Sequence, residues 1–260
     1  MLTSCAANII GSAFPYNVGI YNQAGTNFYT MINFRQGLSY TPLKSTSAVR
    51  DISIYNSGPT AYNIIASEYY PNRWGGMVYL NNTTGYNPGA GKYIFWSNNY
   101  LASEFTQIVS WEYVASNTTY GADIILGAYS GSTHDYWLGT SGYGATPYIF
   151  SRNGSSVSSG ITPVAGRRYI AMINNSASSN SGYFAIYSSA NQSYVNTSIG
   201  GVTLNFSGSP ALGKYGEYND NYLPRVLVGD WLTSWEYPSN FTYANANKIL
   251  QSLKPKLGIP

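Results

Sequence analysis

The sequence has few charged residues, one cysteine and one histidine, and each shortage excludes a class of site. Charged residues make up 9% of the 260 residues, against about 25% in ordinary globular domains. Cys5 has no partner within the chain, so an internal disulfide is excluded. One histidine and one cysteine are too few for the usual zinc sites. The net charge of +3 is small and the basic residues are scattered, so we expect no nucleic-acid partner.

The same shortages leave no catalytic set. His134 stands in the turn-rich stretch Ser130–Asp135, and no Gly-x-Ser-x-Gly elbow accompanies it. The Gly-rich loop followed by Lys and Ser or Thr, which binds phosphates in nucleotide-binding proteins, is also missing. No apolar run is long enough for a membrane span. We therefore predict a protein that is not an enzyme and has neither a resident cofactor nor a membrane span.

Tyrosine and glycine dominate what the chain does contain, with 27 residues each. Aromatic residues supply 16% of the chain, whereas disordered chains are poor in them. Runs of β-branched and aromatic residues are interrupted at short intervals by Gly, Pro, Asn and Ser, which is typical of strands joined by turns. We predict an all-β protein.

Asn-x-Ser/Thr triplets are frequent, and such triplets accept N-linked glycans only in chains that leave the cytoplasm. They begin at Asn81, Asn82, Asn117, Asn153, Asn174, Asn191, Asn196, Asn205 and Asn240. We predict that the protein is glycosylated at these asparagines and works outside the cell. The stretch Met1–Phe14 lacks the basic start and continuous apolar core of a signal peptide, which leaves the route of export open.

The strand-like runs fall into two groups, and we predict two β-sandwich domains, residues 1–98 and residues 99–260. The expected strands lie at 17–21, 28–34, 51–55, 62–66, 75–80, 92–96, 105–114, 124–129, 136–139, 148–150, 169–174, 182–187 and 227–231. One short C-terminal helix follows, capped by Ser239 or Asn240. We expect it to close one end of the second sandwich through an apolar stripe of Ala244, Ile249, Leu250 and Leu253.

The order of motifs after residue 92 resembles the concanavalin A-like, or laminin-G-like, jelly roll. A first strand leads through a Leu-x-x-x-Phe turn to a long strand that contains Trp111, and a hairpin series, a central strand and a terminal helix follow. The stretches that carry the resemblance are Tyr93–Trp96, Leu101–Phe105, Gly166–Ile173, Phe184–Tyr187 and Val226–Asp230. The resemblance implies that residues 99–260 form such a jelly roll.

The first part of the chain is similar to a small β domain that precedes lectin-like jelly rolls in archaeal surface proteins. The matching stretches are Phe28–Phe34, Val49–Tyr55 and Glu68–Tyr70. The resemblance implies a surface protein of an archaeal cell or virus. The few carboxylates agree with this, because a chain that depends little on ionised carboxylates tolerates acidic surroundings.

Jelly rolls also include glycoside hydrolases, which need two carboxylates across the scissile bond. The family's hydrolases carry Glu-x-Asp-x-x-Glu, and this sequence has no such run; Glu104 and Glu112 are eight residues apart. A calcium ion is a further option that the resemblance implies, with Asn219, Asp220 and Asn221 as oxygen ligands. A single carboxylate among these three makes that a weak site.

Two segments combine aromatic rings with polar side chains, as sugar-binding loops do, because Tyr and Trp offer an apolar face and a polar end. Their candidate glycan-binding residues are Tyr129, His134, Asp135, Tyr136, Trp137, Tyr215, Glu217, Tyr218, Asn219, Asp220 and Tyr222. We expect these loops to lie at the rim of the jelly roll and to bind glycans or cell-surface glycoproteins.

An assembly role competes with attachment. Interfaces between subunits are poor in charge and rich in aromatic residues, as this sequence is. The segment Leu2–Phe14 could add a strand to a neighbouring copy and so build a filament or a capsid. We predict a surface or virion protein for adhesion to glycans, with a self-assembling subunit as the alternative and a glycoside hydrolase as the third.

Overall fold

The computed structural model describes residues 30–32, 60–62, 64–70, 73–74, 76–81, 92–95, 104–115, 124–130, 133–140, 147–152, 155–176, 181–196, 209–213, 225–234 and 243–260. Within these ranges most residues belong to β-strands, and a single α-helix lies at the C-terminal end. The predicted all-β class with one short C-terminal helix is confirmed.

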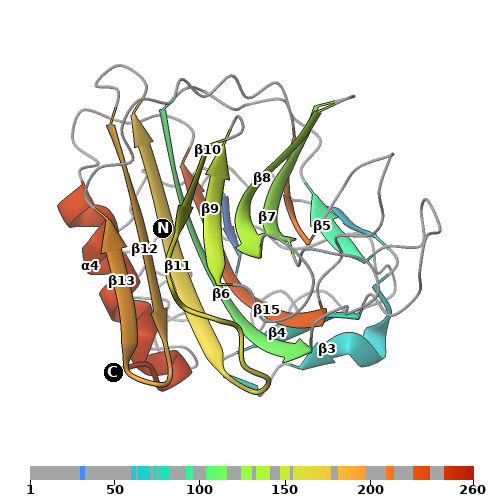
Figure 1. The fold of residues 1–260 in the computed structure, drawn as a ribbon. Helices are drawn as coiled ribbons and strands as arrows, with labels where there is room; N and C mark the ends of the chain where they lie inside the picture. The colour runs from blue at the N-terminus through green and yellow to red at the C-terminus, as the bar shows by residue number, and fades with distance from the viewer. Residues whose placement is uncertain are drawn as a thin grey trace, which may run out of the picture.

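Two antiparallel sheets pack face to face (Figure 1). Sheet A has the order β13 (Gln192–Asn196), β12 (Ser181–Ser188), β11 (Arg168–Ser176), β6 (Glu104–Ala115), β15 (Arg225–Ser234), β4 (Met77–Asn81) and β3 (Tyr69–Tyr70), and β1 (Thr30–Ile32) also pairs with β15. Sheet B has the order β10 (Ser155–Ser158), β9 (Tyr148–Arg152), β8 (Thr133–Thr140), β7 (Ile124–Ser130), β14 (Ser209–Leu212), β5 (Tyr93–Phe95) and β2 (Thr60–Tyr62).

The core between the sheets follows from alternation along the central strand β6. Val109, Trp111 and Tyr113 point inward, because successive side chains of a strand face opposite sides of its sheet. The Trp111 ring meets Tyr148 of sheet B edge-on, with centroids 5.3 Å apart, and stacks on Tyr169 at 5.5 Å. Nε1 of Trp111 donates a hydrogen bond to the Tyr148 hydroxyl over 2.9 Å. This aromatic cluster joins the two sheets at their centre.

A second apolar layer covers the outer face of sheet A. Helix α4 (Tyr243–Leu253) continues into the 3-10 turn η3 (Lys254–Leu257) and runs along the outside of the sheet (Figure 1), where it contacts β11. Its residues Ile249, Leu250 and Leu253 are buried in one cluster with Ile170 and Met172 of β11. The helix therefore covers a face of the sandwich rather than closing an end.

The helix differs from the sequence expectation in two further details. Ala244 is exposed and Ala246 takes its place in the buried stripe. The predicted caps Ser239 and Asn240 lie outside the described residues. Among the described helices, none is long and apolar enough to cross a membrane.

Strands on both sides of residue 98 belong to the same two sheets. β4 pairs with β15 in sheet A, and β5 pairs with β14 in sheet B. The described strands thus do not separate at residue 98. Most of residues 1–98, including the predicted strands at 17–21 and 51–55, lie outside the described residues, and the division into 1–98 and 99–260 stays a prediction for them.

The strand predicted at 62–66 is wrong beyond its first residue. β2 ends at Tyr62, and the 3-10 turn η1 (Ala66–Glu68) follows. Glu68 fixes this turn because its backbone N–H donates to the Ile65 carbonyl over 3.0 Å, while its Oε2 accepts from the Ile65 N–H over 2.9 Å. A carboxylate that closes its own turn overrides the strand preference of the preceding isoleucines.

Candidate functional site

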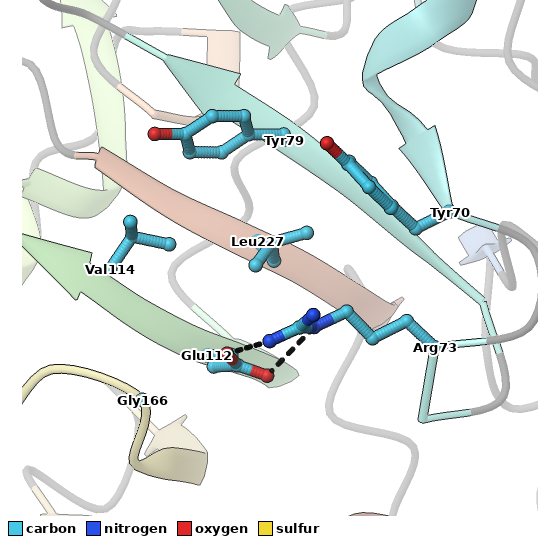
Figure 2. Close-up of a pocket in the computed structure, with 7 residues that line it drawn as sticks. All are labelled: Tyr70, Arg73, Tyr79, Glu112, Val114, Gly166 and Leu227. Atoms are coloured by element: carbon cyan, nitrogen blue, oxygen red, sulfur yellow. Dashed lines mark hydrogen bonds and ion pairs between the residues drawn. The ribbon is translucent and has the colours of Figure 1, made fainter.

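A shallow pocket of about 340 Å³ opens on the outer face of sheet A, on the part that lies beyond the helix. It is lined by Tyr70, Arg73, Tyr79, Glu112, Val114, Gly166 and Leu227 (Figure 2). These residues come from β3, β4, β6 and β15, which are neighbours in the sheet, from the β3–β4 connection and from the turn before β11. Segments far apart in the sequence therefore build one surface.

The connection between β3 and β4 sets one side of the pocket. Arg73 N donates to the Tyr70 carbonyl over 3.2 Å, and Gly76 N donates to the Arg73 carbonyl over 2.8 Å. Between them Trp74 has a φ of +46°, in the left-handed region that a bulky residue seldom occupies. Such backbone strain persists only where surrounding contacts hold it, and it often marks functional sites.

The contacts that hold Trp74 converge on one carboxylate. Nε and Nη2 of Arg73 both donate to the Glu112 carboxylate, and Nε1 of Trp74 donates to its Oε2 over 2.8 Å. The Glu112 side chain is 4% exposed, whereas that of Arg73 is 46% exposed. The hydrogen bond to Glu112 raises the pKa of the Arg73 guanidinium above its ordinary value. Arg73 therefore stays charged and presents part of its guanidinium to solvent.

Arg168 packs against the other side of Trp74. It is the direct register partner of Glu112 on the neighbouring strand, but its guanidinium lies over the Trp74 ring, 3.8 Å from the centroid. Such cation–π contacts are worth about 0.5–2 kcal/mol. A Cβ placed on Gly258 would approach Nη2 of Arg168 to 3.3 Å, so the C-terminal segment also lies against this side chain. The stack orients the indole that hydrogen-bonds Glu112.

The arrangement combines apolar and polar surfaces within one concavity. Tyr70 and Tyr79 lie on one side of Leu227, and the pair of Arg73 and Glu112 lies on the other (Figure 2). Tyr70 is 38% exposed, so part of its ring is open to a ligand. A ring-shaped ligand with an apolar face and hydroxyl groups matches such a surface, because it needs aromatic contact and charged hydrogen-bonding groups together.

The first predicted sugar-binding segment belongs to a hairpin of sheet B and not to this pocket. The stretch Ser130–Asp135, expected as a flexible loop, forms the end of β7 and the start of β8, with only residues 131–132 between the strands. Tyr129 pairs directly with His134, and the register shifts beside Trp137. Asp135 and Tyr136 follow in β8. The glycan-binding role of these residues stays a prediction.

The second predicted segment falls outside the described residues. Its members are Tyr215, Glu217, Tyr218, Asn219, Asp220 and Tyr222. The calcium ligands considered above are among them, so that option stays a prediction. Within the described part of the chain, no group of three or more His, Cys, Asp or Glu side chains is placed to hold a metal ion.

Two predicted glycosylation sites have described side chains, and one is buried while the other is exposed. Asn174 lies in β11, is 1% exposed, and donates from Nδ2 to the Thr106 hydroxyl over 2.7 Å. A glycan on this nitrogen would not fit the folded structure. Asn191 is exposed in the turn before β13, with a φ of +60°. Asn81 and Asn196 end β4 and β13, and the other sites, Asn82, Asn117, Asn153, Asn205 and Asn240, lie outside the described residues.

The residues around the pocket were largely missed at the level of sequence. Glu112 enters the sequence analysis only as half of a hydrolase pair, and Tyr70 only as the end of a matching stretch. The available signal was the dipeptide Arg73-Trp74 before two glycines. A charge beside a tryptophan in a turn is conspicuous in a chain with so few charges.

No protein-family model and no curated protein matches the sequence. Solved structures do match. Trypanosoma rangeli sialidase in complex with sialic acid gives a TM-score of 0.56 at 14% identity over 88% of this chain and 33% of the sialidase chain. Domain 4 of the arabinanase AbnA from Geobacillus stearothermophilus, in complex with arabinotriose, gives 0.52 at 12% identity over 86% of this chain and 98% of that domain.

The binding domain of botulinum neurotoxin DC in complex with SialylT also matches, with a TM-score of 0.52 at 10% identity over 87% of this chain and 52% of the toxin chain. The chain thus spans about a third of the sialidase and about half of the toxin chain, but nearly all of the arabinanase domain. At such identities the likeness shows the fold alone, a β-sandwich of the jelly-roll kind. The fold is consistent with the predicted jelly roll, while the resemblance of the first part of the chain to archaeal surface proteins stays a prediction.

Proposed function

We propose that this protein is a non-enzymatic glycan-binding module on the exterior of a cell or virus particle, and that the pocket on sheet A is its sugar site. The observation that carries the proposal is the pocket itself, where Tyr70 and Tyr79 face the Arg73–Glu112 pair across an apolar floor. Solved structures with the same fold support it, since those proteins are in complex with sialic acid, arabinotriose and SialylT.

The absence of catalysis is part of the proposal. Glycoside hydrolysis usually needs two carboxylates about 5–9.5 Å apart, and Glu112 is the one acidic residue among those that line the described pocket. Its carboxylate accepts hydrogen bonds from Arg73 and Trp74. Such a carboxylate is suited to holding a binding surface in place rather than to exchanging protons with a leaving group.

The exterior location and the glycans on the protein itself belong to the same proposal. They rest on the Asn-x-Ser/Thr triplets, of which Asn191 is exposed in a turn. The archaeal setting rests on the resemblance of the first 90 residues and on the small number of carboxylates. The intact mass of protein from its native source tests the exterior location and the glycans on the protein. Steps of hexose size above 28.4 kDa are expected, and a mass without such steps would contradict the proposed glycosylation.

Assembly is the second candidate, and one observation favours it. β13 is an outermost strand of sheet A in the described part of the chain, and its Val195 is 42% exposed. An open edge strand with an exposed apolar side chain can pair with another chain. Sedimentation of the protein at micromolar concentration separates the two candidates, because attachment needs only a monomer and assembly needs a much larger particle.

The direct test of the sugar site is a glycan-binding screen with neutral and acidic oligosaccharides, followed by variants. Tyr70→Ala and Tyr79→Ala should each weaken binding about tenfold or more, as loss of an aromatic anchor does. Tyr243→Ala is the matched control, because Tyr243 stacks on Tyr183 over the helix-covered part of the same face. It should leave affinity unchanged.

Two results would overturn the proposal. One is the absence of binding to any oligosaccharide on the screen, and the other is binding that neither pocket variant weakens. Products recovered from the bound oligosaccharides after long incubation check the non-enzymatic part. Shortened oligosaccharides would show hydrolase activity and would make Glu112 a candidate catalytic acid.

A further inference from the structure

Arg73 keeps part of its guanidinium available on the solvent side of the pocket. Glu112 accepts hydrogen bonds from Nε and Nη2 of Arg73, and no described residue accepts one from Nη1. The Arg73 side chain is 46% exposed and lines the pocket, whereas that of Glu112 is 4% exposed, so a ligand can approach Arg73 from the solvent side. A guanidinium fixed on one edge offers its remaining donors in a rigid plane.

The charges of the side chains around the pocket on sheet A do not sum to zero. Arg73 and Arg168 are positive and Glu112 is negative, and Glu112 is paired with Arg73. Arg168 forms no ion pair with a described carboxylate; it stacks on Trp74, and its Nε is buried without a hydrogen-bond partner. Among the described residues, one positive charge is therefore left without a carboxylate partner, on the register neighbour of the pocket residue Glu112.

We propose, building on the sugar site above, that the pocket selects acidic sugars, with the ligand carboxylate on the outer edge of Arg73 and the sugar ring against Tyr70 and Tyr79. A carboxylate matches the planar donors of a guanidinium, and hydrogen bonds between charged partners are about twice as strong as neutral ones. The excess charge of Arg168 favours an anion in the pocket. The trio of Trp74, Glu112 and Arg168 holds Arg73 in place.

The position of Leu227 supports the same binding pose. It separates the tyrosines from the charged pair (Figure 2), so a ligand that reaches both must cross an apolar surface. A sugar ring offers C–H groups for that crossing, and a carboxylate at its edge then meets Arg73. A free inorganic anion lacks the ring contact and should bind more weakly than the acidic sugar.

The test compares ligands that differ in charge alone. Sialyllactose and a glucuronate-terminated disaccharide are titrated beside their carboxamide derivatives, by calorimetry or ligand-observed NMR. For at least one pair the acid should bind about tenfold more tightly than its amide, the effect of about 1.4 kcal/mol from charged hydrogen bonds. The difference should shrink as salt rises from about 0.05 to 0.5 M.

Variants then assign the selectivity to Arg73. The double change Arg73→Gln/Glu112→Gln removes both charges and avoids leaving the buried Glu112 carboxylate without its partner, which would destabilise the fold. It should reduce the preference for the acid to within about twofold. Lys248→Gln, on the exposed side of α4, removes one positive charge away from the pocket and should keep the preference.

Each outcome separates this inference from the proposed function. Equal affinity of wild-type protein for acid and amide overturns acid selectivity and leaves glycan binding intact. Failure to bind any sugar overturns both the acid selectivity and the proposed glycan binding. A preference that survives the double change shows that Arg73 does not carry it. If the double variant does not fold, the comparison of acid, amide and salt on the wild-type protein still decides.

Discussion

Thr106 and Gln107 are adjacent, polar and buried in β6, yet their side chains are in opposite situations. The Thr106 hydroxyl accepts a hydrogen bond from Nδ2 of Asn174. Gln107 lies 0% exposed on the inward side of the strand, and neither its Nε2 nor its Oε1 has a hydrogen-bond partner among the described residues. A buried polar group without a partner costs about 1–3 kcal/mol.

We expect Gln107→Met to stabilise the protein by about 1–2 kcal/mol, because Met keeps the shape of Gln and removes the unpaired amide. Thr106→Val is the matched neighbour and should destabilise it by about 1–3 kcal/mol, since the Asn174 amide then loses its partner. Urea denaturation of both variants measures the two free energies of unfolding. A Gln107→Met variant less stable than wild type would mean that the amide has an unseen partner, such as a buried water.

At the scale of the element, α4 is an outer layer that adds a second apolar cluster to sheet A. Leu250 is fully buried there, in the cluster that contains Ile170 and Met172. Leu250→Ala should therefore lower the free energy of unfolding by about 2–5 kcal/mol. Lys248→Ala, two residues earlier on the exposed side of the helix, should change it by less than about 0.5 kcal/mol.

Denaturant unfolding followed by tryptophan fluorescence measures both helix variants. The tryptophan signal includes Trp111 between the sheets, so it detects whether loss of helix packing destabilises the sandwich itself. A Leu250→Ala variant with the wild-type midpoint would show that α4 detaches independently and adds nothing to the stability of the sheets.

The strands that could be predicted from the sequence are those with long alternating apolar runs. The run at 105–114 corresponds to β6, Glu104–Ala115, because the large apolar residues Val109, Trp111 and Tyr113 alternate with the polar Ser110 and Glu112. β10, β13 and β14 were missed. Their sequences are rich in Ser, Asn, Gln and Pro, and they are strands because β9, β12 and β7 offer them paired edges. Such tertiary pairing overrides local propensity.

The pocket was beyond prediction for a related reason. Arg73 and Glu112 are 39 residues apart, and they meet only because β4 pairs with β15 while β15 pairs with β6. Aromatic richness pointed instead to the segments around His134 and Asp220, since a chain with 27 tyrosines marks many places equally. Sheet order is the information that a single sequence does not supply here.

At the scale of the whole molecule, tyrosines couple stability to alkaline pH. Burial raises the pKa of Tyr69, Tyr169 and Tyr243 above the ordinary value for tyrosine. In the unfolded chain these hydroxyls release protons near pH 10, so above that pH the folded chain holds more protons than the unfolded one. Stability is therefore complete below about pH 10 and falls as pH rises further. Lys254 has the opposite effect on stability as pH rises, because burial lowers its pKa. Its side chain is only half-buried, so its contribution to the pH dependence is smaller.

We expect the free energy of unfolding to decline steeply between about pH 10 and pH 12, and Tyr169→Phe to decline less over the same interval. At neutral pH this variant should be about 1 kcal/mol less stable, because the Tyr169 hydroxyl accepts a hydrogen bond from Val164 N over 3.0 Å. The two stability curves should therefore converge as pH rises, which guanidinium titrations at several pH values would show. Parallel curves would mean that ionisation of other groups causes the loss of stability at alkaline pH. A flat wild-type curve would mean that these tyrosines have the same pKa in the folded and the unfolded chain.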